Sequence, residues 1–204
     1  MCVNLCYNQS MSPVTHTPFT DNKKIALCLL SLFVPESMLD VGCGDGGMVA
    51  IARRMLSAER VCGVDITPLH DVHLGARDVY RYHDLIQPLN IGQKFDLVTC
   101  IEVAEHLPER AAPTLCRTLG VHCRQWLVFS AAAPGQGGEG HITLKPGYWW
   151  RDILYRYGGM TYDELMTVRL KLMLQALGIP QMWIPANVQV FGVNKSQQKA
   201  AGIA

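Results

Sequence analysis

Short apolar runs alternate with amphipathic segments through most of the chain. The runs are rich in β-branched residues and apolar on both faces, as in strands that lie between two helix layers of a parallel sheet. They span residues 38–41, 61–64, 79–82, 95–101 and 126–129. Helical periodicity appears between several of them, at residues 48–56, 69–76 and 109–119. This alternation predicts an α/β fold with a doubly wound sheet.

The chain ahead of this alternating part lacks a recognisable period. Residues 1–19 are largely polar and include two prolines, which predicts a flexible arm. A helix is expected over residues 25–33, where apolar side chains recur, with Thr20 or Asp21 as its cap. Pro35 follows and would end this helix.

The last part of the chain changes character. A glycine-rich loop, GQGGEGH, occupies residues 135–141. Two helices and a final strand are expected after it, at residues 148–157, 162–177 and 186–193. The predicted domain therefore spans residues 20–194, and residues 195–204 are expected to form a disordered tail.

Composition and charge favour one soluble globular domain. The 204 residues carry a net charge of +1, with 49% apolar and 17% charged residues. This leaves no basic excess that would indicate a nucleic-acid partner. The longest apolar run, residues 25–34, is too short to cross a bilayer, so no membrane association is expected.

The eight cysteines are dispersed and form no C-x-x-C pair. They are Cys2, Cys6, Cys28, Cys43, Cys62, Cys100, Cys116 and Cys123. Most lie inside apolar runs, where a thiol behaves as a small hydrophobic group. We expect reduced thiols and a cytoplasmic protein, and neither a disulfide framework nor a zinc site.

The sequence LDVGCGDGGM, residues 39–48, is typical of a strand that enters a glycine-rich turn and then a helix. Its glycines match G-x-G-x-x-G, a spacing shared by dinucleotide sites that is a weak signal alone. Gly42 and Gly44 would let the backbone approach a ligand closely, because they lack a Cβ. Asp40 and Asp45 bracket the turn and would repel a pyrophosphate, whereas they suit a ligand that bears an ammonium and a sulfonium group.

Acidic residues also follow the next two predicted strands. Asp65 ends the run VCGVD, where a carboxylate can accept hydrogen bonds from both ribose hydroxyls of a nucleoside. Asp84 lies in YRYHDL, where it could accept from an adenine amino group while Leu85 packs near the ring. Each aspartate has a structural alternative, because an aspartate at a strand end often accepts from the amides of the next turn.

These motifs resemble those of the class I S-adenosylmethionine-dependent methyltransferases. The resemblance rests on residues 40–47, Asp65, the pair 83–84 and the segment 95–106, and it covers residues 20–194. It implies S-adenosylmethionine as the cofactor and a seven-stranded Rossmann-like sheet whose last strand is antiparallel. The cofactor-binding residues that it implies are Asp40, Gly42, Cys43, Gly44, Asp65, Ile66, Asp84, Leu85 and Glu102.

An acidic, histidine-bearing segment follows the strand predicted at residues 95–101. A helical turn would place Glu102, Glu105 and His106 on one side, and His141 lies in the later glycine-rich loop. Two carboxylates and two imidazoles are suitable ligands for Mg²⁺ or Mn²⁺ and leave positions open for substrate oxygens. The set resembles the metal site of the small-RNA 3′-terminal 2′-O-methyltransferases. Some quinone-biosynthesis O-methyltransferases carry the same Glu-x-x-Glu-His segment.

The same residues also have a metal-free interpretation. Glu102 and His106 would then cap the following helix and pack near the cofactor. In that case His141 or His106 would be the catalytic general base that accepts a proton from a hydroxyl group. The sequence leaves both interpretations open.

Three classes of function fit a domain with these motifs. The favoured one is O-methylation of a small-molecule or sugar hydroxyl. Residues 140–150 resemble a segment of methyltransferases of polysaccharide and secondary metabolism, although Thr143 replaces an asparagine there. The second is RNA 2′-O-methylation, which the near-neutral charge disfavours because phosphate contacts need Lys and Arg. The third is a non-catalytic cofactor-binding partner subunit, which the intact motifs disfavour. The sequence names neither the acceptor nor the oligomeric state.

Overall fold

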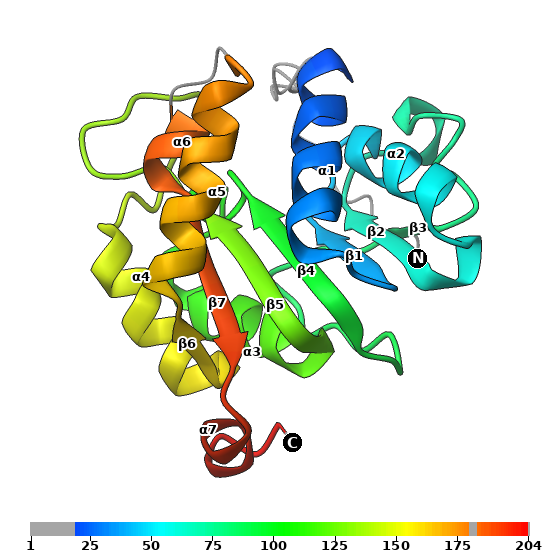
Figure 1. The fold of residues 1–204 in the computed structure, drawn as a ribbon. Helices are drawn as coiled ribbons and strands as arrows, with labels where there is room; N and C mark the ends of the chain where they lie inside the picture. The colour runs from blue at the N-terminus through cyan, green and yellow to red at the C-terminus, as the bar shows by residue number, and fades with distance from the viewer. Residues whose placement is uncertain (1–18, 180–182, 204) are drawn as a thin grey trace, which may run out of the picture.

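The computed structural model of the protein describes residues 19–179 and 183–203. Seven strands form one mixed sheet in the order β3-β2-β1-β4-β5-β7-β6 (Figure 1). The strands are β1 Met38–Val41, β2 Val61–Asp65, β3 Tyr80–Tyr82, β4 Phe95–Ile101, β5 Cys123–Ser130, β6 Met160–Tyr162 and β7 Gln189–Val193. The five strands β1 to β5 are all parallel to one another, whereas β7 is antiparallel to both of its neighbours, β5 and β6. The predicted seven-stranded α/β sheet with an antiparallel last strand is confirmed.

Helices and short helical turns connect the strands. The α-helices are α1 Phe19–Phe33, α2 Gly47–Met55, α3 Ala112–His122, α4 Gly147–Ile153, α5 Glu164–Ala176, α6 Trp183–Asn187 and α7 Lys195–Ala200. The short turns are η1 Ala58–Arg60, η2 Leu69–Asp71, η3 Ala104–His106, η4 Glu109–Ala111 and the π-helical turn η5 Leu154–Gly158. The expected N-terminal arm, residues 1–19, lies outside the described residues except for Phe19, where α1 begins.

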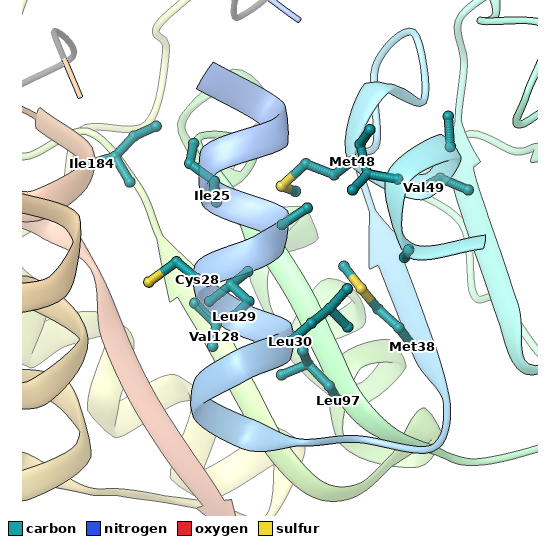
Figure 2. Close-up of a cluster of buried hydrophobic side chains, with 14 of the residues drawn as sticks. Ile25, Cys28, Leu29, Leu30, Met38, Met48, Val49, Leu97, Val128 and Ile184 are labelled. Carbon is teal, nitrogen blue, oxygen red and sulfur yellow. The ribbon is translucent and has the colours of Figure 1, made fainter. Parts of the chain in front are cut away.

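The sheet divides the core into two layers, and neighbouring residues of one strand belong to different layers. Met38 packs in the layer of α1, α2 and α5, whereas Leu39 packs in the layer of α3 and α4. Leu97 and Val98 of β4 divide in the same way. Figure 2 shows side chains of α1 pointing toward Leu97 and Val128 of the sheet. Because both faces are covered, the strands are apolar at consecutive positions.

The C-terminal residues form structure that the sequence did not indicate. Residues 195–200 form α7, so the prediction of a disordered tail is wrong for this segment. Asn194 caps the helix by accepting from the amide of Gln197 at 3.0 Å. The buried side chain of Gln198 donates to the carbonyl of Gly120 at 2.9 Å. A cap and one buried amide therefore order a segment of polar composition.

Other predicted helices also differ from the structure. The helix expected at residues 69–76 is reduced to the short turn η2 at its start. Later backbone amides of this segment bond elsewhere, because the amide of His73 donates to the carbonyl of Asp45 at 2.7 Å. The helix expected from residue 162 begins at Glu164, because Tyr162 belongs to β6. α1 begins ahead of its predicted caps, so Asp21 lies inside the helix.

Within the described residues, no helix is both long and apolar enough to span a bilayer. The cysteines of the same region are free thiols, and all but half-buried Cys43 are buried. They are Cys28, Cys43, Cys62, Cys100, Cys116 and Cys123. Cys2 and Cys6 lie outside the described residues.

Candidate functional site

The predicted site residues lie along the carboxyl edge of the parallel strands. Asp40 is in β1, Asp65 ends β2, and Glu102 directly follows β4. These three strands are adjacent and parallel, so the three acids share one edge of the sheet. Residues 131–146, the loop that carries His141, leave β5 at the same edge, toward which the arrowheads of β4 and β5 point in Figure 1.

The glycine turn after β1 is folded over the end of β2. The amides of Gly42 and Cys43 both donate to the carbonyl of Val64, at 2.8 and 3.1 Å. Gly42 has a φ of 78°, and a Cβ there would lie 2.3 Å from Cγ2 of Val103. Glycine is therefore required at position 42 because Val103 approaches it closely. The sequence had suggested a different reason, namely space for a ligand. The turn joins the cofactor motif to the segment after β4.

Asp40 presents an unpaired carboxylate oxygen at this edge. Its Oδ1 accepts from the hydroxyl of Thr99 at 2.6 Å, across the β1–β4 pair. Its Oδ2 is buried and has no hydrogen-bond partner among the described residues. Burial raises the pKa of the Asp40 carboxyl to about 7, although Thr99 lowers it and Asp65 raises it further. Such an atom is expected to bind a donor from a ligand.

Asp65 connects the glycine turn to the turn after β2. Its Oδ2 accepts from the amide of Gly44 at 2.8 Å. Its Oδ1 accepts from both the amide and the hydroxyl of Thr67, each at 2.9 Å. Three donors therefore occupy a group that has about four acceptor positions, and one position on Oδ2 is left for a ligand hydroxyl.

The residues predicted to surround the adenine are placed after β2 and β3. Asp84 is exposed, and its Oδ1 accepts from the amide of Ile86 at 3.0 Å, which is the structural alternative for this aspartate. Leu85 is buried, whereas Ile66 is half exposed at 49%. In the glycine turn, burial raises the pKa of the Cys43 thiol well above its usual value, so this side chain stays neutral.

Glu102 has an unusual backbone conformation at the end of β4. Its φ is 55°, a region that few non-glycine residues adopt. Its amide donates to the carbonyl and to the hydroxyl of Ser130, both at 3.1 Å. Burial, and next the charge of Glu105, raise the pKa of the Glu102 carboxyl to about 7, against the lowering effects of Ser130 and Asn187. Conformations of this kind are frequent at functional sites.

Glu105 is fully buried and holds the loop after β5 near both of its ends. Its Oε1 accepts from the amide of Ala132 at 3.1 Å. Its carbonyl accepts from the amides of Ile142 and Thr143, at 2.8 and 3.0 Å. Its Oε2 is buried with no partner in the described part of the chain, and burial raises the pKa of the carboxyl. The loop and the segment after β4 therefore form one structural unit.

Both predicted histidines meet Glu105 in this unit. The rings of His106 and His141 are nearly perpendicular, with centroids 4.9 Å apart. One ligand atom each of Glu105, His106 and His141 lies within 4.8 Å of the other two. Glu102, the fourth predicted metal ligand, is not part of this group and lies beside Glu105 instead. Nδ1 of His141 is buried and has no partner among the described residues.

The protonation state of His106 suits both roles predicted for His106 and His141, metal ligand and general base. Burial, and next the neighbouring His141, lower the pKa of the His106 imidazole. His106 is therefore neutral near pH 7, as a metal ligand or a general base must be.

A family model described as a methyltransferase domain matches residues 19–162 of the chain. The match begins at the first residue of α1 and ends at the last residue of β6, so it includes the glycine turn and His141. The chain belongs to this methyltransferase family.

Curated relatives of this methyltransferase domain share part of its sequence. The ubiquinone biosynthesis O-methyltransferase of Psychrobacter arcticus is 35% identical over 88 residues, which are 38% of this chain and 33% of the relative. The enzyme of the same name from Albidiferax ferrireducens is 33% identical over 105 residues, which are 47% of this chain and 40% of the relative. The matches cover less than half of the length of these relatives.

Solved structures similar to this methyltransferase domain are more distant in sequence. The sugar N-methyltransferase KedS8 from a Streptoalloteichus species superposes with a TM-score of 0.60 at 15% identity, over 95% of this chain and 98% of that one. The magnesium protoporphyrin IX methyltransferase of Synechocystis PCC 6803, solved with bound S-adenosylhomocysteine, gives a TM-score of 0.54 at 21% identity, over 71% and 74% of the two chains. At these identities the likeness shows the fold alone.

Several polar side chains of the candidate site were missed in the sequence. They are Thr99, which donates to Asp40; Ser130, which accepts from Glu102; and Gln136 and Asn187, which hydrogen-bond each other at 2.8 Å. A hydroxyl at the end of a predicted strand could have indicated Ser130. Nothing in the local sequence indicates Asn187, because it reaches the site only through the return of the chain into β7.

Proposed function

We propose that this domain transfers the methyl group of S-adenosylmethionine to a hydroxyl oxygen of a small molecule or a sugar. One observation carries the proposal: the acid-bracketed glycine turn and the group of Glu105, His106 and His141 share one edge of the sheet. The first suits a cationic cofactor, and the second suits activation of a hydroxyl. The O-methyltransferase names of the curated relatives support oxygen as the acceptor atom.

The cofactor-binding roles follow from which atoms the fold leaves unpaired. Oδ2 of Asp40 would accept from the ammonium of the methionine portion, and the remaining position on Oδ2 of Asp65 would accept from a ribose hydroxyl. Buried Leu85 offers an apolar surface to the adenine. When bound, S-adenosylmethionine supplies a methyl group on a positively charged sulfur.

Glu105, His106 and His141 fit a divalent cation such as Mg²⁺ or Mn²⁺. Oε2 of Glu105 and Nδ1 of His141 are both buried without a partner among the described residues, and the three ligand atoms lie close together. A cation held there would lower the pKa of an acceptor hydroxyl. Without one, the imidazole of His141 or His106 would accept the hydroxyl proton directly. In both cases the fully buried Glu105 fixes the orientation of the loop that carries His141.

The other two classes of function lack a supporting observation. RNA 2′-O-methylation would need phosphate contacts, and the chain has a net charge of +1. A partner subunit without chemistry would not need the two converging histidines or a strained Glu102.

The experiment is methyl transfer from radiolabelled S-adenosylmethionine to a panel of catechols, other phenols, sugars and short RNAs. Transfer to a small-molecule hydroxyl, lost in His141→Ala and His106→Ala, is the expected result. Transfer to the RNA alone would replace the proposal with the second class. Binding of S-adenosylhomocysteine with no transfer to any acceptor, with and without Mg²⁺ or Mn²⁺, would favour the third.

A further inference from the structure

The middle of the loop after β5 lacks the anchors that Glu105 gives to its ends, although the backbone of Gly140 hydrogen-bonds the side chain of His106. Residues 133–140 contain four glycines, whose backbone is unusually free. Gln136 is the side chain that organises this stretch. Oε1 of Gln136 accepts from the backbone amide of Ala133 at 2.6 Å, and the backbone amide of Gln136 donates to the carbonyl of Ala133 at 3.0 Å. These bonds close a turn but connect it to nothing else.

Asn187 connects this turn to the rest of the site. It ends α6, twenty-five residues beyond the part of the chain that the family model matches. Its Nδ2 donates to Oε1 of Gln136 at 2.8 Å. Its side chain also lies against Glu102, where it lowers the pKa of that carboxyl. An amide nitrogen carries two hydrogens, so one Asn187 side chain can donate to Gln136 and to Glu102 together.

The segment that contains Asn187 is itself fixed on two sides. Nζ of Lys171 in α5 donates to the carbonyl of Ala186 at 2.7 Å. Buried Gln189, at the start of β7, accepts from Nε of Arg151 at 2.6 Å. A Cβ on Gly147 would lie 3.0 Å from Nε2 of Gln189, so the start of α4 packs closely against it. Residues 186–189 thus contact both the middle of the loop and the helix that follows it.

We propose that Asn187 is a positioning residue: through Gln136 it holds the loop that carries His141 in place beside Glu102. The catalytic consequence rests on the proposed function, whereas the hold on the loop does not. Without the Asn187 amide, residues 133–140 keep their internal turn but lose their bond to the α6–β7 junction. Gly140 and Ile142, on either side of His141, keep their bonds to His106 and Glu105, so the disorder is concentrated around Gln136 and the acceptor hydroxyl meets a less ordered loop.

Hydrogen exchange of the full chain saturated with S-adenosylhomocysteine tests the hold on the loop. Asn187→Ala should speed exchange of residues 133–140 by about three- to tenfold, the change expected when one hydrogen bond is lost. The matched control is Asn194→Ala, which removes bonds to the amide of Gln197 and the hydroxyl of Thr161 at a remote helix start. Exchange of the loop should not change in this control. Unchanged exchange in Asn187→Ala, or an equal rise in the control, would overturn the proposal.

Two further variants separate hydrogen bonding through Gln136 from simple packing. Gln136→Ala should reproduce the faster exchange, and the double variant with Asn187→Ala should add nothing to it. Asn187→Asp keeps the shape but cannot donate to Oε1 of Gln136, so it should behave like Asn187→Ala. Additive effects in the double variant, or wild-type exchange in Asn187→Asp, would overturn the proposed route through Gln136.

Kinetics distinguish failure of this proposal from failure of the proposed function. With an acceptor found in the methyl-transfer panel, Asn187→Ala should lower kcat or raise the acceptor KM while leaving the affinity for S-adenosylhomocysteine unchanged. Equal loss of cofactor affinity would indicate a merely structural role and overturn the proposal. If the wild-type protein methylates nothing, the proposed function fails, and the exchange experiment still decides the role of Asn187.

Discussion

The proposed cofactor half of the site, from β1 to β3, and the proposed acceptor half, from β4 to β7, hold their polar groups in different ways. In the cofactor half, Asp65 already accepts from Gly44 and Thr67, and the turn is complete without a ligand. In the acceptor half, Glu102 and Glu105 each keep a buried oxygen with no partner among the described residues. The first half is preformed apart from Oδ2 of Asp40, which is also buried and unpaired among the described residues, whereas the second contains several groups whose pairing requires a proton, a cation or a substrate.

The largest expected effect tests whether the cofactor half is preformed. Gly42→Ala places a Cβ 2.3 Å from Cγ2 of Val103 and retains a φ of 78° that alanine disfavours. We expect a loss of about 2–4 kcal/mol in the free energy of unfolding, from overpacking and backbone strain together. Urea denaturation measures this loss, and binding of S-adenosylhomocysteine should weaken with it.

Two variants show whether the contact with Val103 is the cause. Gly137→Ala is the matched control, because a Cβ at Gly137 meets nothing within 4 Å in the described structure. Its effect should stay within about 0.5 kcal/mol. Combining Gly42→Ala with Val103→Ala should recover part of the loss, since the clash is removed. A Gly42→Ala protein as stable as the wild type would show that the turn adapts, and the comparison between the halves would fail.

The next effect concerns Asp40, whose buried Oδ2 has no partner among the described residues. Burial raises the pKa of this carboxyl from its usual 3.8 to about 7 in the folded protein. Between these values the folded state holds a proton that the unfolded state has lost, so this group lowers the free energy of unfolding as pH rises from about 4 to about 7. Asp40→Asn removes the penalty. It should be more stable than the wild type at pH 8, on the order of 1–4 kcal/mol, with little difference at pH 4.

Urea denaturation of both proteins at pH 4, 6 and 8 measures this dependence, and calorimetry adds the functional half of the prediction. Asp40→Asn should bind S-adenosylmethionine more weakly at pH 8, because the ammonium loses a carboxylate partner. A stability difference that does not vary with pH would show that Asp40 titrates normally. The preformed half would then contain no strained acid.

The sequence placed the acids of the proposed cofactor half at one edge of the sheet because the determinants of that placement are local. Consecutive apolar residues identify strands covered on both faces, and acids directly after such strands must lie at one edge. The positions of Asp65 and the glycines can therefore be predicted from residues 39–65 alone. The reason why residue 42 must be glycine could not be predicted, because Val103, which approaches it, lies in the segment after β4.

The acceptor half was predicted only in part because its contacts join distant segments. Glu105 and His141 were found as residue types, but their meeting depends on amides at Ile142 and Thr143. Asn187 and Gln136 are fifty-one positions apart, and neither belongs to a motif. β6 and α7 were missed for a similar reason: a three-residue strand and a six-residue helix depend on partners more than on their own pattern.

The third prediction measures how much Asp65 contributes to cofactor binding. Asp65→Ala leaves the amides of Gly44 and Thr67 without their acceptor and removes a position for a ribose hydroxyl. Affinity for S-adenosylhomocysteine should fall by about 1–3 kcal/mol in titration calorimetry. Asp78→Ala, at an exposed aspartate paired with Arg53, should leave affinity unchanged. Unaltered binding in Asp65→Ala, or binding of NAD by the wild type, would contradict the assignment of this half.

The last prediction has the smallest expected effect and addresses the acceptor half. Glu105→Gln can still accept from the amide of Ala132, so the loop should stay in place, but the charge beside His106 and His141 is lost. We expect Mn²⁺ affinity, followed by electron paramagnetic resonance with S-adenosylhomocysteine bound, to fall by at least about tenfold, which is ~1.4 kcal/mol. Cofactor affinity should not change, because the two halves hold their ligands with different residues.

Two matched variants decide whether the cation site has three protein ligands or the four first expected. Glu102→Gln alters the acid that lies beside Glu105 but outside the group of three, so its effect on Mn²⁺ should be smaller than that of Glu105→Gln. Glu109→Gln removes a surface partner of Lys145 and should have no effect. Equal losses in Glu102→Gln and Glu105→Gln would restore the four-ligand site. A wild-type protein that binds no Mn²⁺ would leave His141 or His106 as the general base, and the buried oxygen of Glu105 would then be satisfied by a proton.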